Sequence, residues 1–339
     1  MAELERPLVA MVGGDTLLAK EIRELLGESR PVPRVQLISA AAEASTLLSL
    51  VEDQEAAVLT PLSPESLEGA SVAFLAGSQA SSRRTLKLNP SGGPVLIDLA
   101  GALEDYPHAR LRAPSAEPLQ RPRTASSIHV IAHPAAIALT MFLSRLARTG
   151  AAGGGAKIRR AVVHIFEPAS ERGQQGLDEL QQQTVAVLNF QKLRQDVFDA
   201  QVGFNVLARY GEEAPEPLES IEERLERHLA SLLVDWPGVP MPSLRLIQAP
   251  VFHGHSFSLW VEFEERPKVE EIEEALEREG IDVRREEPPT NVGVAGQSGL
   301  SAGAITVDSN NASACWFWIV ADNLRLVAEN AVAVAREIL

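Results

Sequence analysis

The chain has 339 residues, more than a single hydrophobic core usually serves, so we expect two domains. Its 45% hydrophobic and 23% charged residues are typical of a globular protein. The formal net charge of −15 repels the phosphate backbone of a nucleic acid and therefore argues against nucleic-acid binding.

The cysteine content and the hydropathy indicate a cellular compartment. The single cysteine, Cys315, excludes an internal disulfide, as is usual in a reducing cytosol. The opening residues MAELERPLVA are acidic and lead directly into a strand, which does not match a signal peptide. No run approaches the roughly 18 apolar residues of a membrane span. We expect a soluble cytoplasmic protein that does not bind membranes.

The first part of the chain alternates short apolar strands with helices. Strands are predicted over residues 8–12, 35–39, 71–77 and 95–100, and helical periodicity runs from Thr16 to Leu26. Because no hairpin turns separate these strands, the pattern predicts an α/β fold with a doubly wound parallel sheet. We assign residues 1–132 to this domain.

From Pro134 onward strands and helices mix, with long loops between them. Helices are predicted over residues 136–148, 173–188 and 268–280, with a charged helix inside 211–233. Strands are predicted over residues 161–166, 245–252, 256–263 and 314–320, and a Gly/Ser-rich loop over 288–304. This pattern predicts an α+β domain over residues 133–320. The helix within 321–339 has the length and periodicity to pack back on the first domain.

The stretch 130-VIAHPAAIAL-139 joins the two parts. It is predicted as a strand, a turn at Pro134 and the start of an apolar helix. Turns of this kind usually carry the chemistry of α/β enzymes. Here the turn offers only the methyl groups of Ala135 and Ala136.

Several segments occur in an order and spacing that resemble the aspartate-semialdehyde dehydrogenase family across essentially the whole chain. They are VAMVGGD, SVAFLAG, VLIDLAG, VIAHP, ASERGQQGLDEL, FNVL, APVFHGHSFSLWVEF and FWIVADNLRLVAENAVAVA. The resemblance implies a Rossmann-like dinucleotide-binding domain completed by the C-terminal helix, and a central domain for catalysis and dimerisation. It also implies a homodimer and an NADP-dependent reduction of aspartyl phosphate to aspartate semialdehyde, in the synthesis of lysine, methionine and threonine.

In this family a cysteine thiolate attacks the acyl phosphate, and the nicotinamide then reduces the thioester. The resemblance places that cysteine in an Asn-Pro-Asn-Cys turn, where a helix N-terminus lowers the thiol pKa. Here the turn reads His133-Pro134-Ala135-Ala136, so Ala136 stands at the cysteine position. Cys315 lies in an apolar strand and is expected in the core. The pattern resembles the Usg-like branch, whose members keep the fold and lack the cysteine.

The substrate positions implied by the resemblance are also changed. An arginine that clamps the substrate carboxylate is replaced by Gln248, which cannot form the same fork. A second arginine corresponds to Ala304. His255, in the segment Gly-His-Ser, matches the catalytic histidine of the family and is the catalytic residue that the resemblance predicts.

The cofactor positions are only partly kept. The family loop Gly-Ala-Thr-Gly-x-Val-Gly reads 13-GGDTLLA-19, so Gly13 remains while Thr16 and Ala19 stand where glycines belong. Asp15 adds a negative charge where pyrophosphate would bind. Glu43 is the only charge after the second strand, where the family has an arginine for the 2′-phosphate. NADP is thus the candidate cofactor, with an eroded phosphate loop. The resemblance places four residues near it: Gly13, Gly77, Ser170 and Asn323.

Simpler structural roles stay open for several of these residues. Gly13 and Gly14 suit a tight strand-to-helix turn without any ligand. His253 and His255 would face the same side of a predicted strand, but no third ligand is evident, so no metal site is predicted. His133 would either face the active-site pocket or cap its turn. The pair Asp322-Asn323 is expected to begin the last helix, as a cap and near the cofactor.

Three hypotheses about function follow. The first is a catalytically impaired paralogue with a binding or regulatory role, which pairs with the true enzyme or holds a small carboxylate near His255. The second is an enzyme of altered chemistry that uses His255 or His133 without covalent catalysis. The third is an active NADP-dependent aspartate-semialdehyde dehydrogenase whose missing groups are supplied in another way.

Overall fold

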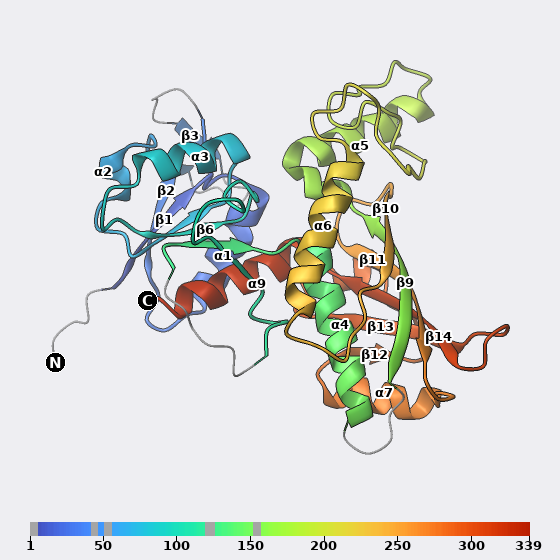
Figure 1. Cartoon of the computed structure of the whole chain (residues 1–339). Helices are drawn as coiled ribbons and strands as arrows, with labels where there is room; N and C mark the ends of the chain where they lie inside the picture. The colour runs from blue at the N-terminus through green and yellow to red at the C-terminus, as the bar shows by residue number, and fades with distance from the viewer. Residues whose placement is uncertain (1–5, 42–46, 51–55, 119–125, 152–156) are drawn as a thin grey trace. The chain divides into compact units, whose positions relative to one another are not determined.

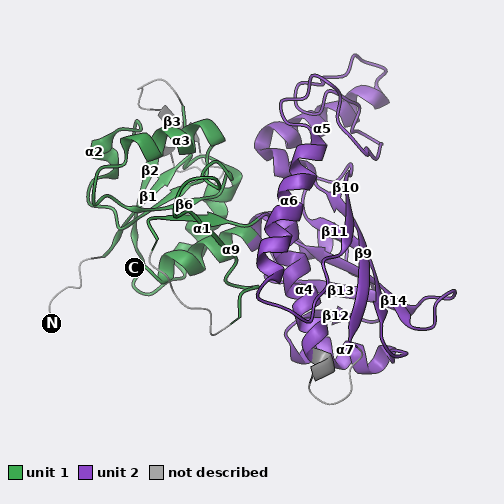
Figure 2. Ribbon diagram, viewed as in Figure 1, with its two compact units in different colours: residues 1–132, 327–339 green, residues 133–326 purple. Residues whose placement is uncertain are grey.

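The computed structural model describes residues 6–41, 47–50, 56–118, 126–151 and 157–339, and the chain divides into two compact units (Figures 1 and 2). Unit 1 comprises residues 1–132 and 327–339, and unit 2 comprises residues 133–326. Glu43, the charge expected beside the 2′-phosphate position, lies outside the described residues. No helix within the described ranges is both long and apolar enough to cross a membrane.

Unit 1 is built on a six-stranded parallel sheet with the strand order β2-β1-β5-β6-β8-β7. The strands are β1 (Leu8–Val12), β2 (Arg34–Ile38), β5 (Val72–Leu75), β6 (Val95–Asp98), β7 (Arg110–Arg112) and β8 (Ile128–Ile131). The helices are α1 (Leu17–Gly27), α2 (Pro64–Leu67), α3 (Gln79–Leu88) and most of the C-terminal α9 (Asn323–Arg336). The central strands are buried apolar runs, as a parallel sheet covered on both faces requires. The predicted doubly wound α/β fold is confirmed.

Unit 1 also contains elements that the sequence pattern did not indicate. β3 (Leu47–Leu50) and β4 (Ala56–Leu59) form a separate antiparallel pair, so the expectation that no hairpin interrupts the strands is wrong. Strand β7 has only three residues, all of them half-buried, and such a short segment shows no periodicity to recognise.

Unit 2 is built on a six-stranded mixed sheet with the strand order β10-β9-β11-β14-β13-β12. The strands are β9 (Ile158–Glu167), β10 (Ser243–Gln248), β11 (His255–Phe263), β12 (Asp282–Arg284), β13 (Ser301–Val307) and β14 (Ala314–Ala321). The helices are α4 (Pro134–Ala151), the 3-10 turn η1 (Ala169–Arg172), α5 (Gly173–Leu188), α6 (Leu218–Leu233), α7 (Val269–Arg278) and α8 (Asn291–Val294). The expected α+β fold of this half is confirmed.

Helix α4 is the centre of unit 2. It contacts α6 and α7 and lies with them along one face of the sheet (Figure 1). Its first turns are fully buried, and Phe142 packs edge-on against Phe317 of β14, with 5.3 Å between ring centroids. The start of α4 therefore lies inside the protein, where each polar group needs a partner.

Two sequence assignments in unit 2 need correction. The loop predicted over 288–304 contains α8 and the first residues of β13. The strand predicted over 245–252 ends at Gln248, before Pro250, which has no N–H for a sheet. Gly254 adopts a positive φ of 83° and begins a new direction of the chain, so His253 precedes β11 and is not part of it.

We predict that the buried ion network of Arg112 anchors the end of the chain to unit 1. The Arg112 guanidinium binds Glu117 at 2.9 Å and Glu337 at 3.0 Å, and the Glu117 side chain is 7% exposed. Because Arg112→Met would remove the cation that bridges Glu117 and Glu337 in a partly buried setting, it should lower the free energy of unfolding by about 3 kcal/mol in urea denaturation. The matched control is Arg83→Met, on the surface of α3. A loss similar to that of the control would contradict the prediction.

Candidate functional site

The turn before α4 presents no nucleophile. Pro134 occupies the first position of the helix, where its missing N–H removes no hydrogen bond. The Ile137 N–H donates to the His133 carbonyl oxygen at 3.0 Å and closes the first turn. Ala136 is completely buried, and its methyl group stands at the position that the resemblance gives to the thiol.

His133 caps this helix and also faces other histidines. Its Nδ1 accepts from the Ala135 N–H at 3.2 Å, and its own backbone N–H donates to Nδ1 of His228 on α6 at 3.0 Å. Because a ring nitrogen that accepts carries no proton, the neutral forms of His133 and His228 hold their proton on Nε2. Burial holds the pKa of His133 well below its ordinary value, and nearby His255 adds to the effect. His133 is thus a cap on one side and a donor on the other.

His255 is the first residue of β11 and is 1% exposed. Its ring lies edge-on to that of His133, with 5.8 Å between the centroids. Within the described part of the chain, neither ring nitrogen of His255 has a hydrogen-bond partner. Burial lowers the pKa of His255, and Glu171 opposes this shift. The result is a neutral imidazole with a free lone pair, able to accept a proton.

Asn323, the first residue of α9, joins η1 to the turn before β11. Its Oδ1 accepts from the Ser170 hydroxyl at 3.2 Å and from the Gly254 N–H at 2.9 Å. Its Nδ2 donates to Glu171 at 2.6 Å, and the other oxygen of Glu171 lies 3.8 Å from Nε2 of His133. Ser170 and Asn323 are therefore brought together beside the histidines. Their contact with a cofactor stays a prediction.

Gln248, at the end of β10, is already fully hydrogen-bonded within the protein. Its Oε1 accepts from the Tyr210 hydroxyl at 2.6 Å. Its Nε2 donates to the carbonyl oxygens of Glu167 at 3.0 Å and Ala249 at 2.9 Å. A side-chain amide has two N–H groups, and both are used here. Gln248, which the resemblance places at the substrate-arginine position, therefore has no donor left for a carboxylate.

A partly buried ion network adjoins the cluster of His133, His228, His255 and Asn323. The Arg172 guanidinium binds Glu167 at 3.3 Å and Glu216 at 2.6 Å, and Arg224 lies 3.6 Å from Glu216. Burial raises the pKa of Glu167, because desolvation disfavours the carboxylate more strongly than Arg172 favours it. The arginines here are engaged with carboxylates of the protein.

Polar atoms without partners gather in this part of unit 2. Among the buried side chains that the structure describes, they include Nε2 of His133, both ring nitrogens of His255, Oε2 of Glu167 and Nε of Arg172. Each such group costs about 1–3 kcal/mol if it stays unpaired, and proteins seldom leave several together. Their concentration around one helix start indicates a site that takes a ligand or ordered water.

The one thiol of the chain cannot serve this site. Cys315 is fully buried in β14, where its backbone pairs with Val261 of β11, so the expected core position is confirmed. Burial raises the pKa of Cys315 to about 11, so the thiolate is scarce at neutral pH.

The turn after β1 in unit 1 uses most of its own donors. The Gly13 and Gly14 N–H groups both donate to the Ile38 carbonyl oxygen, at 2.8 and 3.3 Å. The Thr16 N–H donates to the Gly13 carbonyl oxygen, and the Thr16 hydroxyl caps α1 by accepting from the Ala19 N–H at 3.2 Å. With these amides bonded internally and Asp15 exposed beside them, the residues do not fit a pyrophosphate well.

Gly13 and Gly77, both predicted at the cofactor, are in close contact. Gly13 has a positive φ of 80°, and a Cβ there would lie 2.6 Å from the Gly77 nitrogen. This contact explains the need for glycine at position 13 without any ligand. Binding of a cofactor by these two residues stays a prediction.

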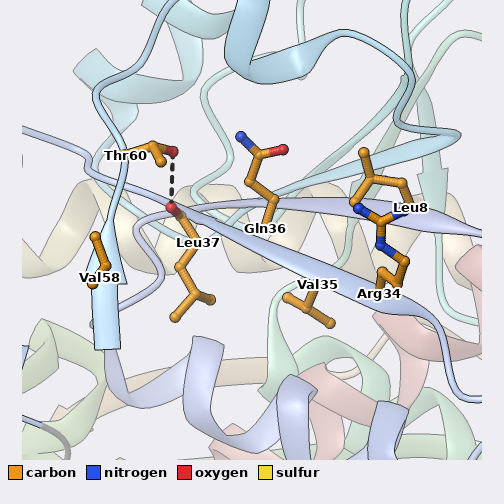
Figure 3. A pocket seen from close by; sticks show the side chains of 7 residues that line it. All are labelled: Leu8, Arg34, Val35, Gln36, Leu37, Val58 and Thr60. Carbon is orange, nitrogen blue, oxygen red and sulfur yellow. Dashed lines mark hydrogen bonds between the residues drawn. The ribbon is translucent and has the colours of Figure 1, made fainter. Parts of the chain in front are cut away.

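An open pocket of about 410 Å³ lies along β2 in unit 1 (Figure 3). Its lining residues are Leu8, Arg34, Val35, Gln36, Leu37, Val58 and Thr60. The Thr60 hydroxyl donates to the Leu37 carbonyl oxygen at 3.1 Å. Because this lining is mainly aliphatic and holds no two groups able to exchange a proton, the histidine cluster of unit 2 is the better candidate.

Two further expectations concern a metal site at His253 and His255, and Ala304 at the position of the second arginine. His253 precedes β11, so the idea that it shares a strand face with His255 is wrong. Across the described ranges, no group of three or more potential ligands could hold a metal ion. Ala304 has a positive φ of 46° and is exposed at an irregularity of β13.

Sequence reasoning missed four members of the cluster: His228, Glu167, Glu171 and Arg172. A signal existed for His228, which lies three residues after Leu225 and one before Leu229, on the apolar face of an amphipathic helix. Glu171 and Arg172 follow Ser170 in the segment that carried the family resemblance, and Glu167 lies just before that segment. Their closeness to His255 arises from tertiary structure and could not be read from spacing.

Comparison with known proteins agrees with this fold. A family model described as "Semialdehyde dehydrogenase, dimerisation domain" matches residues 154–326, just over half of the chain. A USG-1 protein homolog of Azotobacter vinelandii is 30% identical over 340 residues, which cover 96% of each chain. An aspartate-semialdehyde dehydrogenase of Rickettsia bellii is 25% identical, over 98% of this chain and 97% of the relative.

A solved structure points the same way. It is that of a probable aspartate-semialdehyde dehydrogenase from Pseudomonas aeruginosa, with 27% sequence identity, a TM-score of 0.81 and coverage of 98% of both chains. Both the sequence similarity and the shared fold extend over nearly the whole length. The chain therefore belongs to the aspartate-semialdehyde dehydrogenase family.

Proposed function

We propose that this protein does not catalyse the thiolate-dependent reaction of the family and acts as a binding or regulatory paralogue of the Usg-like kind. Its ligand in this proposal is a small carboxylate held near His255. The observation that carries the proposal is the gathering of unpartnered polar atoms around a helix start that has no thiol. A site that had lost both chemistry and binding would be expected to have closed over these atoms.

The covalent route has no starting group. Acyl transfer to the protein needs a thiolate beside the bound acyl phosphate, and Ala136 supplies only a methyl group. Cys315 is a buried thiol with a raised pKa. Gln248 adds a second obstacle, because both of its N–H groups are donated to backbone carbonyls. His255 keeps its capacity to hold a proton but has no thiol to deprotonate.

The residues of unit 1 do not fit NADP well. The turn from Gly13 to Ala19 donates four of its backbone N–H groups to acceptors within the protein. Asp15 places a negative charge at the end of α1, where a pyrophosphate would need positive potential. We infer that any NADP binding is much weaker than in an enzyme that turns the cofactor over.

The family also suggests an assembly and a location. Because the matched family model is a dimerisation domain, we propose a homodimer formed through unit 2. A protein whose single cysteine is a buried free thiol also suits the cytoplasm, which we propose as its location.

A second candidate is an oxidoreductase or other enzyme of altered chemistry that uses His255. It is favoured by the free ring nitrogens of His255 and by Glu171, whose carboxylate lies within 3.8 Å of His133. For this candidate, His255→Ala must abolish an activity found by substrate screening. An activity that survives the substitution would exclude His255 as its base.

We predict no phosphate-dependent reduction of NADP with aspartate semialdehyde, followed by absorbance of the reduced nicotinamide. Ala136→Cys alone should stay inactive, because the saturated amide of Gln248 cannot hold the substrate carboxylate. The double variant Ala136→Cys with Gln248→Arg is the informative comparison. Turnover by the native protein at rates typical of enzymes, about 1–1000 per second, would refute the proposed function.

We predict that the native protein resists alkylation by iodoacetamide near neutral pH. Cys315 is fully buried, and its raised pKa leaves a very small thiolate fraction. Mass spectrometry should find no adduct on the folded chain and a single adduct after unfolding in guanidinium. Rapid labelling of the folded protein would show that its thiol is accessible after all.

We predict that titration with NADPH, followed by nicotinamide fluorescence, shows no saturation at micromolar concentrations. Removing the charge and restoring a glycine, in the double variant Asp15→Ala with Thr16→Gly, should strengthen binding by about tenfold or more. Arg83→Ala, a charge change on the surface of α3, serves as the control. Tight binding by the native protein would instead show that the turn still accepts a pyrophosphate.

A further inference from the structure

The start of α4 leaves one backbone donor unused between two that are bonded. The Ala135 N–H is bonded to the ring of His133, and the Ile137 N–H to its carbonyl oxygen. Between them, the Ala136 N–H finds no acceptor among the described residues. Because α4 has 18 residues, its N-terminus also carries a positive partial charge. An acceptor, and preferably a negatively charged one, is required there.

Two imidazoles supply independent evidence for the same acceptor. The His133 side chain is 2% exposed, and its Nε2–H is left without a partner, because the nearest carboxylate oxygen, on Glu171, is 3.8 Å away. His255 stands 5.8 Å from it, ring to ring, and offers one donor and one acceptor in its neutral form. One oxygen-bearing group placed beside the two touching rings would give partners to these nitrogens.

The charges of the site limit the ligand class. Arg172 and Arg224 are already paired with Glu167 and Glu216, so no guanidinium is left uncompensated for a doubly charged phosphate. A single carboxylate needs only a few N–H donors and half a positive charge from the helix. Because Ala136 carries no thiol, its backbone N–H at the helix start is available to a carboxylate of this kind.

We propose that the start of α4 holds one carboxylate group of a small organic acid, between the Ala136 N–H, Nε2–H of His133 and the ring of His255. We further propose that His255 takes up a proton when this anion binds. This inference rests on the proposed function and assigns the groups that carry it out. The only covalent bond that forms in the protein on binding is then the new N–H bond of His255.

The coupling to protons follows from the surroundings of His255. The groups that face it are Glu171 and Arg172 of η1, Asp322 before α9, His133 before α4, and Glu167 through its pair with Arg172. In the free protein, burial and Arg172 lower the pKa of His255, while Glu171 and Asp322 oppose this. A bound carboxylate adds a further negative charge, which raises the pKa. Affinity should therefore fall by about tenfold per pH unit as the pH rises from the pKa of His255 in the free protein to its higher pKa in the complex, and should level off above that value.

The test uses the full chain with its seven histidines labelled with ¹⁵N in the ring, and propionate as the probe. Nitrogen–proton correlation spectra report the tautomer and the protonation of each ring. Propionate should shift the signals of His133 and His255, raise the pKa of His255, and bind more weakly as the pH increases. Inorganic phosphate should not compete.

Two substitutions of His133 distinguish its role as the cap of α4 from its role as a hydrogen-bond donor to the ligand. His133→Asn keeps an acceptor for the Ala135 N–H but loses the distal donor, so it should weaken propionate binding by about tenfold. His133→Gln retains a distal N–H donor and should bind propionate more tightly than His133→Asn. His253→Gln, in the turn before β11, is the matched control and should bind as the native protein does.

The inference is overturned if propionate leaves both ring signals unchanged at concentrations up to about tens of millimolar. It is also overturned if His133→Asn binds as well as the native chain, or if affinity does not depend on pH. These outcomes differ from failure of the proposed function, which would appear as turnover with NADP whatever propionate does.

Discussion

Burial of the first turn of α4 is the constraint on which unit 2 depends. A helix start leaves N–H groups unbonded, and here these groups are enclosed by the sheet and by α6. His133 relieves part of this cost with its ring, and His228 accepts the N–H that His133 itself contributes. The remaining donors set the chemical character of the site. The site is thus polar because the packing of α4 buries these N–H donors, and not because of any exposed charge.

The strand-to-helix turns of the two units differ in how far their N–H donors are hydrogen-bonded within the protein. In unit 1 the turn after β1 closes on itself, since Ile38 and Thr16 accept its N–H groups and Gly77 fills the space beside Gly13. In unit 2 the turn before α4 keeps donors free beside His255. We therefore place the proposed ligand in unit 2.

The sequence predicted the fold well wherever burial of one face or of a whole strand gives a regular pattern of apolar residues. The apolar runs of β1 and β5 indicated a parallel sheet, and the helix predicted over 173–188 coincides with α5. Segments with weak signals were missed, among them β7 with three residues and β13 behind a glycine-rich stretch. Within the site, the resemblance led to the proposal that Ala136 stands at the cysteine position of the family. The bonding of Gln248 and the approach of His228 could not, because both depend on partners distant in sequence.

The saturated amide of Gln248 also bears on the history of such a chain. An arginine at this position would displace the Tyr210 hydroxyl from its acceptor and would crowd the carbonyl oxygen of Glu167. The neighbours of Gln248 thus fit a glutamine, and a single Gln248→Arg substitution would disturb their hydrogen bonds. For the paralogue that we propose, a return to the chemistry of the family would therefore need several substitutions together. In evolutionary terms, the proposed function would be entrenched at this site.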